Sequence, residues 1–123
     1  MSPKEIVAAD IQKNHQNKSM DWHIKRISDT IASGGQVVQQ NKTLFLFKST
    51  TRGEVQFHTY NADPGPQLAE NTRKFFRMLK KAGARQVYTV YDSPKISQLF
   101  GLLEPEFKAK ITKDKMYKAK VNL

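Results

Sequence analysis

The fold is decided by residues 79–107, "LKKAGARQVYTVYDSPKISQLFGLLEPEF", where one helix ends, a strand follows and another helix begins. Gly83 is typical of the position just after a helix, because glycine adopts the left-handed conformation without a steric penalty. The run "RQVYTVY" is rich in β-branched and aromatic residues, which favour a strand. Ser93 can cap a short helix whose first residue is Pro94. The stretch therefore predicts helix, strand and helix in succession.

Three further helical segments or helix starts can be identified upstream. The helix that Gly83 ends carries an apolar stripe at helical spacing, formed by Leu68, Thr72, Phe75, Phe76 and Leu79. Near the N-terminus, Ser2 and Glu5 form the capping-box pattern that opens a helix, which we expect within residues 1–18. Isoleucines recurring at helical spacing predict a second, amphipathic helix over residues 20–31.

Strands are predicted in two other parts of the chain. Residues 36–61 contain three runs with a period of two, separated by short polar breaks of hairpin length, which predicts an antiparallel meander. In residues 43–47 apolar side chains face both ways, as in a central strand, although an edge strand that pairs with another subunit stays open. The C-terminal run "EFKAKITKDKMYKAKVNL" predicts a closing hairpin. The fold class is therefore mixed α/β (α+β), in the order ααβββαβαββ.

Size and composition limit what the protein can be. The chain of 123 residues and 14.1 kDa suits a single domain, 1–123, with one core. No apolar run approaches the roughly 20 residues that span a bilayer, and no signal-peptide pattern is present, so we expect a soluble, cytoplasmic protein without a membrane partner. There is no cysteine, and His15, His23 and His58 fall in separate predicted elements, so no metal site is expected.

The charge balance is strongly positive. Lysine and arginine number 21 against 11 aspartate and glutamate residues, which gives a net charge of +10 and a pI near 9.9. A field of this sign favours anionic partners such as nucleic acid, acyl-CoA phosphates or an acidic protein surface. A solvated basic surface that serves only solubility accounts for the same count, so charge alone does not choose between them.

Two groups of basic residues are candidate contacts for nucleic acid or another anion. The first lies on the outer face of the helix before Gly83 and consists of Arg73, Lys74, Arg77 and Lys81. The second alternates with apolar residues in the C-terminal hairpin and consists of Lys108, Lys110, Lys118 and Lys120. Half-buried hairpin strands would present these lysines as a stripe on the exposed face, although lysines also protect sheet edges from aggregation. Aromatic residues do not visibly interleave with these charges, so the sequence gives no support for base stacking.

The chain resembles the GNAT superfamily of N-acetyltransferases. Residues 79–107 are similar to the second half of that superfamily's core, in the Gly-Ala turn, the strand, the polar-Pro cap and the short helix. The order of elements from residue 20 onward is also similar. The resemblance implies a mixed, strongly twisted sheet of about six strands with helices on both faces. It further implies that the sheet splays apart between the strand ending near Asn61 and the strand beginning near Gln86.

The resemblance also marks a cofactor loop. In active members a glycine-rich turn before the main helix lets backbone amides approach the pyrophosphate of acetyl-CoA. The residues at or beside the matching positions here are Asp63, Gly65, Gln67 and Leu68, with Pro66 among them. Proline has no N–H to donate, leucine crowds the backbone, and aspartate repels phosphate. We therefore expect a degenerate loop and no cofactor, with bound acetyl-CoA as the alternative. An ordinary turn into a helix explains the same residues.

A second departure from the superfamily concerns catalysis. The late helix of active members commonly carries a tyrosine that protonates the departing CoA thiolate, and the resemblance places Phe100 at that position. Phenylalanine cannot donate a proton, so no catalytic residue is expected there. Glu54, His58 and Tyr60 on the third predicted strand are the side chains that could deprotonate an amine. Such strand residues are more often ordinary core-edge or solvent-facing side chains.

Three classes of function stay open. The first is a non-catalytic GNAT-like protein that binds or assembles with a protein partner, and it is favoured by the lost glycines and by Phe100. The chain resembles short phage-encoded forms, some of which serve in the virion, so this resemblance implies a virion component or a protein of the host cytoplasm. The second class is a divergent acyl-CoA-dependent N-acetyltransferase. The third is a basic nucleic-acid-binding module.

Overall fold

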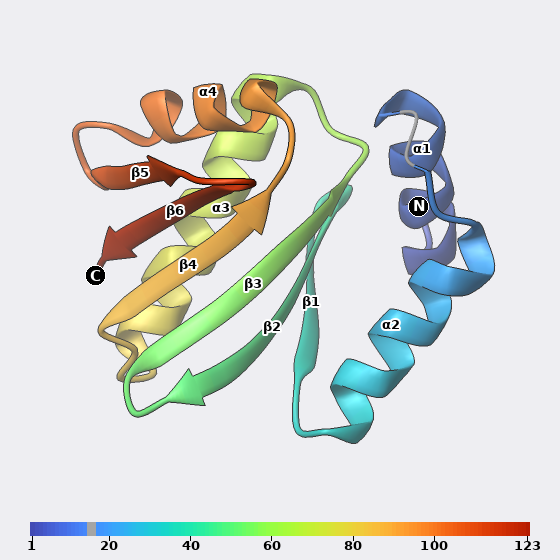
Figure 1. Cartoon of the computed structure of the whole chain (residues 1–123), viewed down its shortest axis with the longest axis horizontal. Helices are drawn as coiled ribbons and strands as arrows, with labels where there is room; N and C mark the ends of the chain where they lie inside the picture. Colours follow the sequence, from blue (N-terminus) through green and yellow to red (C-terminus); the bar gives the residue numbers. More distant parts are fainter. Residues whose placement is uncertain (15–16) are drawn as a thin grey trace.

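The computed structural model describes residues 1–14 and 17–123, so His15 lies outside the described residues. Within these ranges four helices and six strands follow one another in the predicted order (Figure 1). The helices are α1 (Pro3–Asn14), α2 (Met20–Ala32), α3 (Gly65–Lys81) and α4 (Pro94–Leu103). The strands are β1 (Gln36–Gln40), β2 (Thr43–Thr51), β3 (Glu54–Asn61), β4 (Gln86–Tyr91), β5 (Ala109–Lys113) and β6 (Tyr117–Asn122).

The strands form one mixed sheet in the order β1-β2-β3-β4-β6-β5. β3 and β4 run parallel, and the other neighbouring strands are antiparallel. Because β2 lies between β1 and β3, residues 43–47 belong to an interior strand, and the edge alternative is wrong. Helices α1 and α2 pack against β1, β2 and β3 from one side, while α3 lies behind the sheet and contacts α4 (Figure 1).

Apolar side chains form two cores, one on each face of the sheet. In the larger core, beneath α3 and α4, Phe45 of β2 stacks on Phe75 of α3 with ring centroids 4.3 Å apart. In the smaller core, beneath α1 and α2, Ile6 packs with Leu44 and Tyr60. Successive residues of β2 thus contribute to opposite cores, which confirms the prediction that both faces of this strand are covered.

The predicted helix ends are confirmed. The backbone N–H of Glu5 donates to Ser2 Oγ over 3.2 Å, and the backbone N–H of Ser2 donates to Glu5 Oε1 over 3.0 Å, which completes the capping box of α1. Ser93 caps α4 by accepting a backbone N–H from its first turn. Gly83 follows α3 with a φ of 102°, the left-handed conformation that favours glycine. No described helix is long and apolar enough to cross a membrane.

Candidate functional site

The sheet opens between β3 and β4. The two strands are paired through residues 54–56 of β3 and residues 86–88 of β4, where each strand begins. Beyond this ladder, residues 57–61 separate from residues 89–91, and the two strands diverge toward the end of β3 (Figure 1). The splay that the resemblance implies is therefore confirmed. The loop that leads into α3 begins at the wide end of this opening, where a cofactor loop is expected.

The carboxylate of Asp63 lies inside this loop. Asp63 is 6% exposed, and its Oδ2 accepts three hydrogen bonds. The donors are the backbone N–H of Lys42 at 2.8 Å, the hydroxyl of Thr43 at 3.1 Å and the Nδ2 amide of Asn71 at 2.8 Å. A buried carboxylate needs several donors to offset its lost hydration. Asp63, which the resemblance places at a phosphate-binding position, therefore makes its hydrogen bonds within this chain.

Neighbouring amide side chains cross-link the same loop. Asn61 donates through Nδ2 to the carbonyl of Asp63 over 2.7 Å and accepts the backbone N–H of Asp63 over 2.9 Å. Asn71 is fully buried on α3, and its Oδ1 accepts amide groups from Asn41 and Gln67, both at 2.8 Å. Gln67, one of the predicted loop residues, is thus held against α3 by Asn71. A polar network of this kind fixes one loop conformation because its members reinforce one another.

The start of α3 presents few free amides. The helix begins at Gly65, and its N-cap Pro64 makes no side-chain cap. The N–H of Leu68 already bonds the carbonyl of Pro64 over 2.8 Å, and Pro66 has no N–H. This leaves the amides of Gly65 and Gln67 to face an anion, next to a buried carboxylate that repels it. The geometry is poorly suited to a pyrophosphate.

Phe100 is a core residue. Its side chain is 3% exposed and lies parallel to the ring of Tyr91, with centroids 6.3 Å apart. The Tyr91 hydroxyl lies 2.7 Å from Ser97 Oγ, in a hydrogen bond between β4 and α4. The position that resembles a proton donor of the superfamily is therefore occupied by an apolar ring, and the adjacent phenol has a structural partner.

The three candidate bases on β3 are not brought together. Glu54 stands at the narrow end of the β3–β4 opening, while His58 and Tyr60 lie beneath α2. His23 of α2 joins the latter pair, with its Nδ1 2.8 Å from the Tyr60 hydroxyl. The rings of His58 and Tyr60 meet edge to face, with centroids 4.8 Å apart. The result is an aromatic cluster of buried His23 and Tyr60 with half-buried His58, which we call the histidine cluster.

Burial keeps the histidine cluster uncharged. Desolvation, aided by Arg26 and His23, lowers the pKa of His58 from its ordinary 6.5 to about 3. Desolvation also lowers the pKa of His23 and raises the pKa of Tyr60. The Nε2 atoms of His23 and His58 are buried without a hydrogen-bond partner among the described residues. A neutral imidazole can accept a proton, but these nitrogens lie where solvent does not reach them.

The basic residues of α3 are partly neutralised. Arg77 binds Glu106 through two hydrogen bonds of 2.7 and 2.5 Å. Arg73 lies 3.0 Å from Glu70 and also donates to the carbonyl of Leu102. Lys74 and Lys81, the other two predicted contacts on this helix, are exposed. Of the predicted contacts in the C-terminal hairpin, three are exposed (Lys108, Lys110 and Lys118) and Lys120 is half-buried. The helix group and the hairpin group lie on opposite sides of the sheet.

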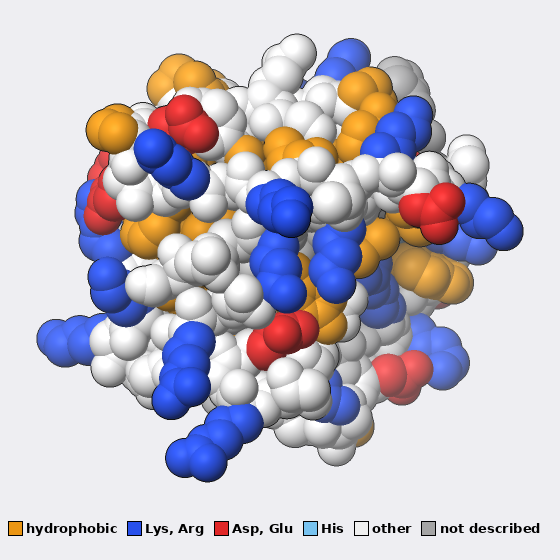
Figure 2. All heavy atoms as spheres, turned by 60° about the vertical axis from the view of Figure 1, so that its left-hand side comes forward, with side chains coloured by type: hydrophobic (Ala, Val, Ile, Leu, Met, Phe, Trp, Pro, Cys, Tyr) orange, Lys and Arg blue, Asp and Glu red, His pale blue; other side chains and the backbone are white. Residues whose placement is uncertain are grey.

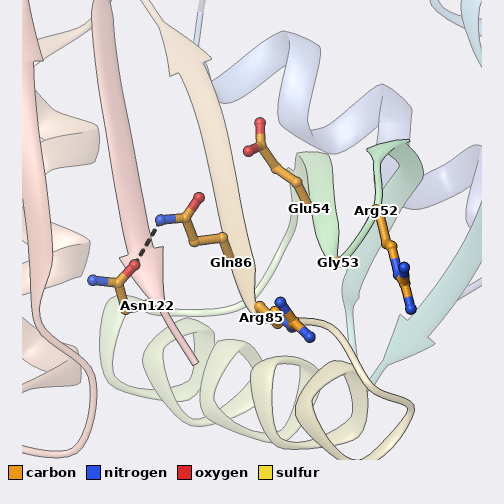
Figure 3. Close-up of a pocket in the computed structure, with 6 residues that line it drawn as sticks. All are labelled: Arg52, Gly53, Glu54, Arg85, Gln86 and Asn122. Carbon is orange, nitrogen blue, oxygen red and sulfur yellow. Dashed lines mark hydrogen bonds between the residues drawn. The ribbon is translucent and has the colours of Figure 1, made fainter.

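A shallow hollow of about 360 Å³ lies at the narrow end of the β3–β4 opening, away from the α3 loop (Figure 3). Arg52 and Arg85 flank Gly53 there, and Glu54 extends away from both arginine side chains. Gln86 and Asn122 close one side of it through a 2.7 Å hydrogen bond. No group of three His, Asp or Glu residues in the described ranges could hold a metal ion.

Two buried residues of these sites were not identified from the sequence. Asn71 falls at helical spacing between Leu68 and Phe75, so a polar residue on an apolar stripe was the available signal. His23 gives no such signal, because its hydrogen-bond partner Tyr60 lies 37 positions away, on β3. The sequence places both residues in helices and leaves their partners undetermined.

Comparisons with known proteins agree on the fold. No protein-family model and no curated protein matches the chain. Among solved structures, an N-acetyltransferase from Staphylococcus aureus Mu50 has a TM-score of 0.62 at 13% identity, over 99% of this chain and 94% of that one. A ribosomal-protein-alanine N-acetyltransferase from Brucella melitensis has a TM-score of 0.61 at 8% identity, over 98% and 92%. The chain has the GNAT fold, as the resemblance implied.

Proposed function

We propose that this chain is a GNAT-fold binding protein that does not transfer acyl groups from acetyl-CoA. The observation that carries the proposal is the buried carboxylate of Asp63, which occupies the cofactor loop and accepts its hydrogen bonds from Lys42, Thr43 and Asn71. A phosphate at this loop would meet a fixed negative charge and only two free amides.

Two further observations support the loss of catalysis. Phe100 supplies no hydroxyl to protonate a departing thiolate, and the nearest phenol on β4 is hydrogen-bonded to Ser97. The neutral imidazole of His58, a candidate base, has its Nε2 buried beneath α2. A fold in which Phe100 replaces the proton donor and the Nε2 of His58 is buried is better suited to binding than to turnover.

The proposal includes an assembly role. The resemblance to short phage-encoded forms implies a virion component, and such a role needs a binding surface and a stable fold but no chemistry. A protein partner or an anionic partner would meet the same requirement. The loss of acetyl-CoA chemistry and the virion role therefore belong to one proposal. Identifying the partner would show whether the chain binds a virion protein, another protein or an anionic molecule.

A divergent acyl-CoA-dependent N-acetyltransferase is the second candidate. The observation that favours it is the retained separation of β3 from β4 beyond residues 54–56, since this opening is where the resemblance places an acyl-CoA. In that case the cofactor would have to contact amides other than those of the α3 turn. The two candidates differ in whether coenzyme A binds at all.

Thermal unfolding with and without millimolar acetyl-CoA or coenzyme A separates the two candidates. We expect these compounds to raise the Tm no more than an equal concentration of ATP, which controls for binding of any phosphate to a basic surface. A cofactor present at about 100 times its Kd would stabilise the folded state by about 2.7 kcal/mol. For a domain of this size that corresponds to a rise of several degrees.

A second measurement follows thiol release from acetyl-CoA with a panel of primary amines. We expect no release above the rate without protein. A Tm rise of several degrees that is specific to the CoA compounds, or measurable turnover with any amine, would contradict the proposed function and favour the acetyltransferase.

A further inference from the structure

One part of the sheet is covered by helices on one face only. Along β4 and β6, the buried side chains Val87, Ala119 and Val121 point into the core beneath α3. Since side chains alternate along a strand, their neighbours point to the opposite face. We call this opposite surface of β4, β6 and β5 the open sheet face. The residues that matter on it are Tyr88, Val90, Lys110, Lys118 and Lys120.

The strand register concentrates three lysines around one aromatic ring. Lys120 of β6 lies directly opposite Lys110 of β5 on one side and Tyr88 of β4 on the other. Lys118 lies opposite Val90, and its Nζ sits 4.6 Å from the centre of the Tyr88 ring. Figure 2 turns the β5–β6 edge of the sheet forward and shows basic side chains close together near its middle. The face therefore combines positive charge with a half-buried ring over which Lys118 lies.

This arrangement is unfavourable for stability. Like charges directly opposite each other on neighbouring strands repel, as Lys110 and Lys120 do here. The ion pairs formed by the described residues involve other basic side chains, so no carboxylate neutralises this pair. An anionic partner would supply the missing negative charge.

Protection of a sheet edge explains Lys110 but not Lys118 or Lys120. An edge strand uses lysine to prevent pairing with another chain, and this reason applies to Lys110 on β5. Strand β6, however, lies between β4 and β5 and has both of its edges paired. Edge protection therefore does not account for Lys118 and Lys120.

We propose that the open sheet face binds single-stranded nucleic acid, with phosphates on Lys110, Lys118 and Lys120 and a base on Tyr88. Aromatic rings on a basic sheet are platforms for stacking bases that are not paired. Lysines two residues apart on a strand stand about 7 Å apart, a spacing that suits successive phosphates of an extended strand. On binding, Lys118 leaves the Tyr88 ring for a phosphate as a base takes its place.

The ring beside the lysines favours a single strand over the other anionic partners. An acidic protein surface would be satisfied by the lysines alone and would make no use of Tyr88 or of Val90, which is 38% exposed. Duplex DNA is read mainly by elements that enter a groove, and the open sheet face presents none. This inference rests on the proposed function, because it names the partner of a protein that binds without catalysing acyl transfer.

Fluorescence anisotropy with a labelled oligothymidine of about 16 nucleotides, near the upper end of known site sizes, tests the proposal. We expect binding that weakens by about 20-fold between about 50 and 200 mM salt, the dependence for three phosphate contacts. Replacing Lys118 and Lys120 together by glutamine should reduce the salt dependence to that of about one contact. The matched control replaces Lys74 and Lys81 on α3 by glutamine, which removes the same charge from the other side of the sheet.

The variant Tyr88→Leu separates stacking from charge. We expect Tyr88→Leu to weaken binding by about 10-fold while leaving the salt dependence unchanged. The variant removes the ring on which a base stacks but keeps the lysines that contact the phosphates. Thermal unfolding of each variant confirms that the fold is retained, and the double glutamine variant on β6 should unfold at no lower temperature, since it relieves repulsion between lysines.

The proposal is overturned if the oligonucleotide does not bind at low salt, or if the α3 control weakens binding as much as the β6 variant. It is also overturned if polyglutamate competes as well as oligothymidine and Tyr88→Leu has no effect, which would indicate an acidic protein partner. If the oligonucleotide test fails and coenzyme A does not raise the Tm specifically, single-stranded nucleic acid is excluded as the partner, and the proposed function is not contradicted. A CoA-specific rise contradicts the proposed function whatever the oligonucleotide does.

Discussion

Replacing Asp63 by alanine is expected to lower the free energy of unfolding by about 3 kcal/mol, because the backbone N–H of Lys42 and an amide N–H of Asn71 lose their acceptor, while the Thr43 hydroxyl keeps Asn61 Oδ1. The hydroxyl of Thr43 and the amide of Asn71 are buried with the carboxylate. Denaturant unfolding monitored by circular dichroism measures the loss. Asp63→Asn should lose less, since an amide oxygen of the same shape still accepts hydrogen bonds.

The control for this prediction is Asp92→Ala. Asp92 is exposed in the turn before α4, so its removal should change stability by less than about 0.5 kcal/mol. Equal small losses for Asp92→Ala and Asp63→Ala would show that the carboxylate does not hold the α3 loop. The interpretation of this loop as a structural element would then be wrong, and its availability to a ligand would need to be reconsidered.

Acidification from about pH 7 to about pH 5 is expected to lower the free energy of unfolding by about 2 kcal/mol through His58. The pKa of His58 is about 3 in the folded state against 6.5 when free, so the unfolded chain binds a proton below pH 6.5 and the folded chain does not. Stability is therefore complete above pH 6.5 and falls as the pH drops, by at most about 1.4 kcal/mol per unit. His23, whose pKa is also lowered, adds to the same trend.

Denaturant unfolding at several pH values tests this prediction, and His58→Phe is the matching variant. Phenylalanine keeps a ring against Tyr60 but does not titrate, so most of the loss between about pH 7 and pH 5 should disappear. If the variant shows the same pH dependence as the original chain, His58 is not the group responsible.

Local patterns in the sequence predict the elements of this fold well. The capping box at Ser2, the glycine at position 83 and the alternation through residues 43–47 each act within a few neighbouring residues, and each is confirmed. The element order, together with the motif in residues 79–107, was sufficient for the GNAT fold. These features depend on short-range geometry, which is why a single sequence reveals them.

The internal contacts of the candidate site depend on long-range geometry. The carboxylate of Asp63 meets donors at positions 42, 43 and 71, and nothing in the sequence pairs those positions. The histidines at positions 23 and 58 fall in separate predicted elements without ligand spacing, yet the fold brings both against Tyr60. Sequence spacing says little about contacts between elements that meet only in the tertiary fold.

The lysines of the hairpin show the same limit. Alternation along the chain correctly predicted an exposed stripe, but base stacking found no support because no aromatic residue alternates with those charges on that face. The sheet order brings in Tyr88 from β4, which is about 30 positions away and lies opposite Lys120. The same order makes β6 an interior strand, and this removes the simplest structural explanation for Lys118 and Lys120.

The position of β2 has a consequence for the cooperativity of the domain. Phe45 of β2 packs in the core beneath α3 and α4, while its neighbour Leu44 packs in the core beneath α1 and α2. Strand β2 thus contributes side chains to both cores, and a displacement of this strand would disturb both. We therefore expect the two helical layers to unfold together.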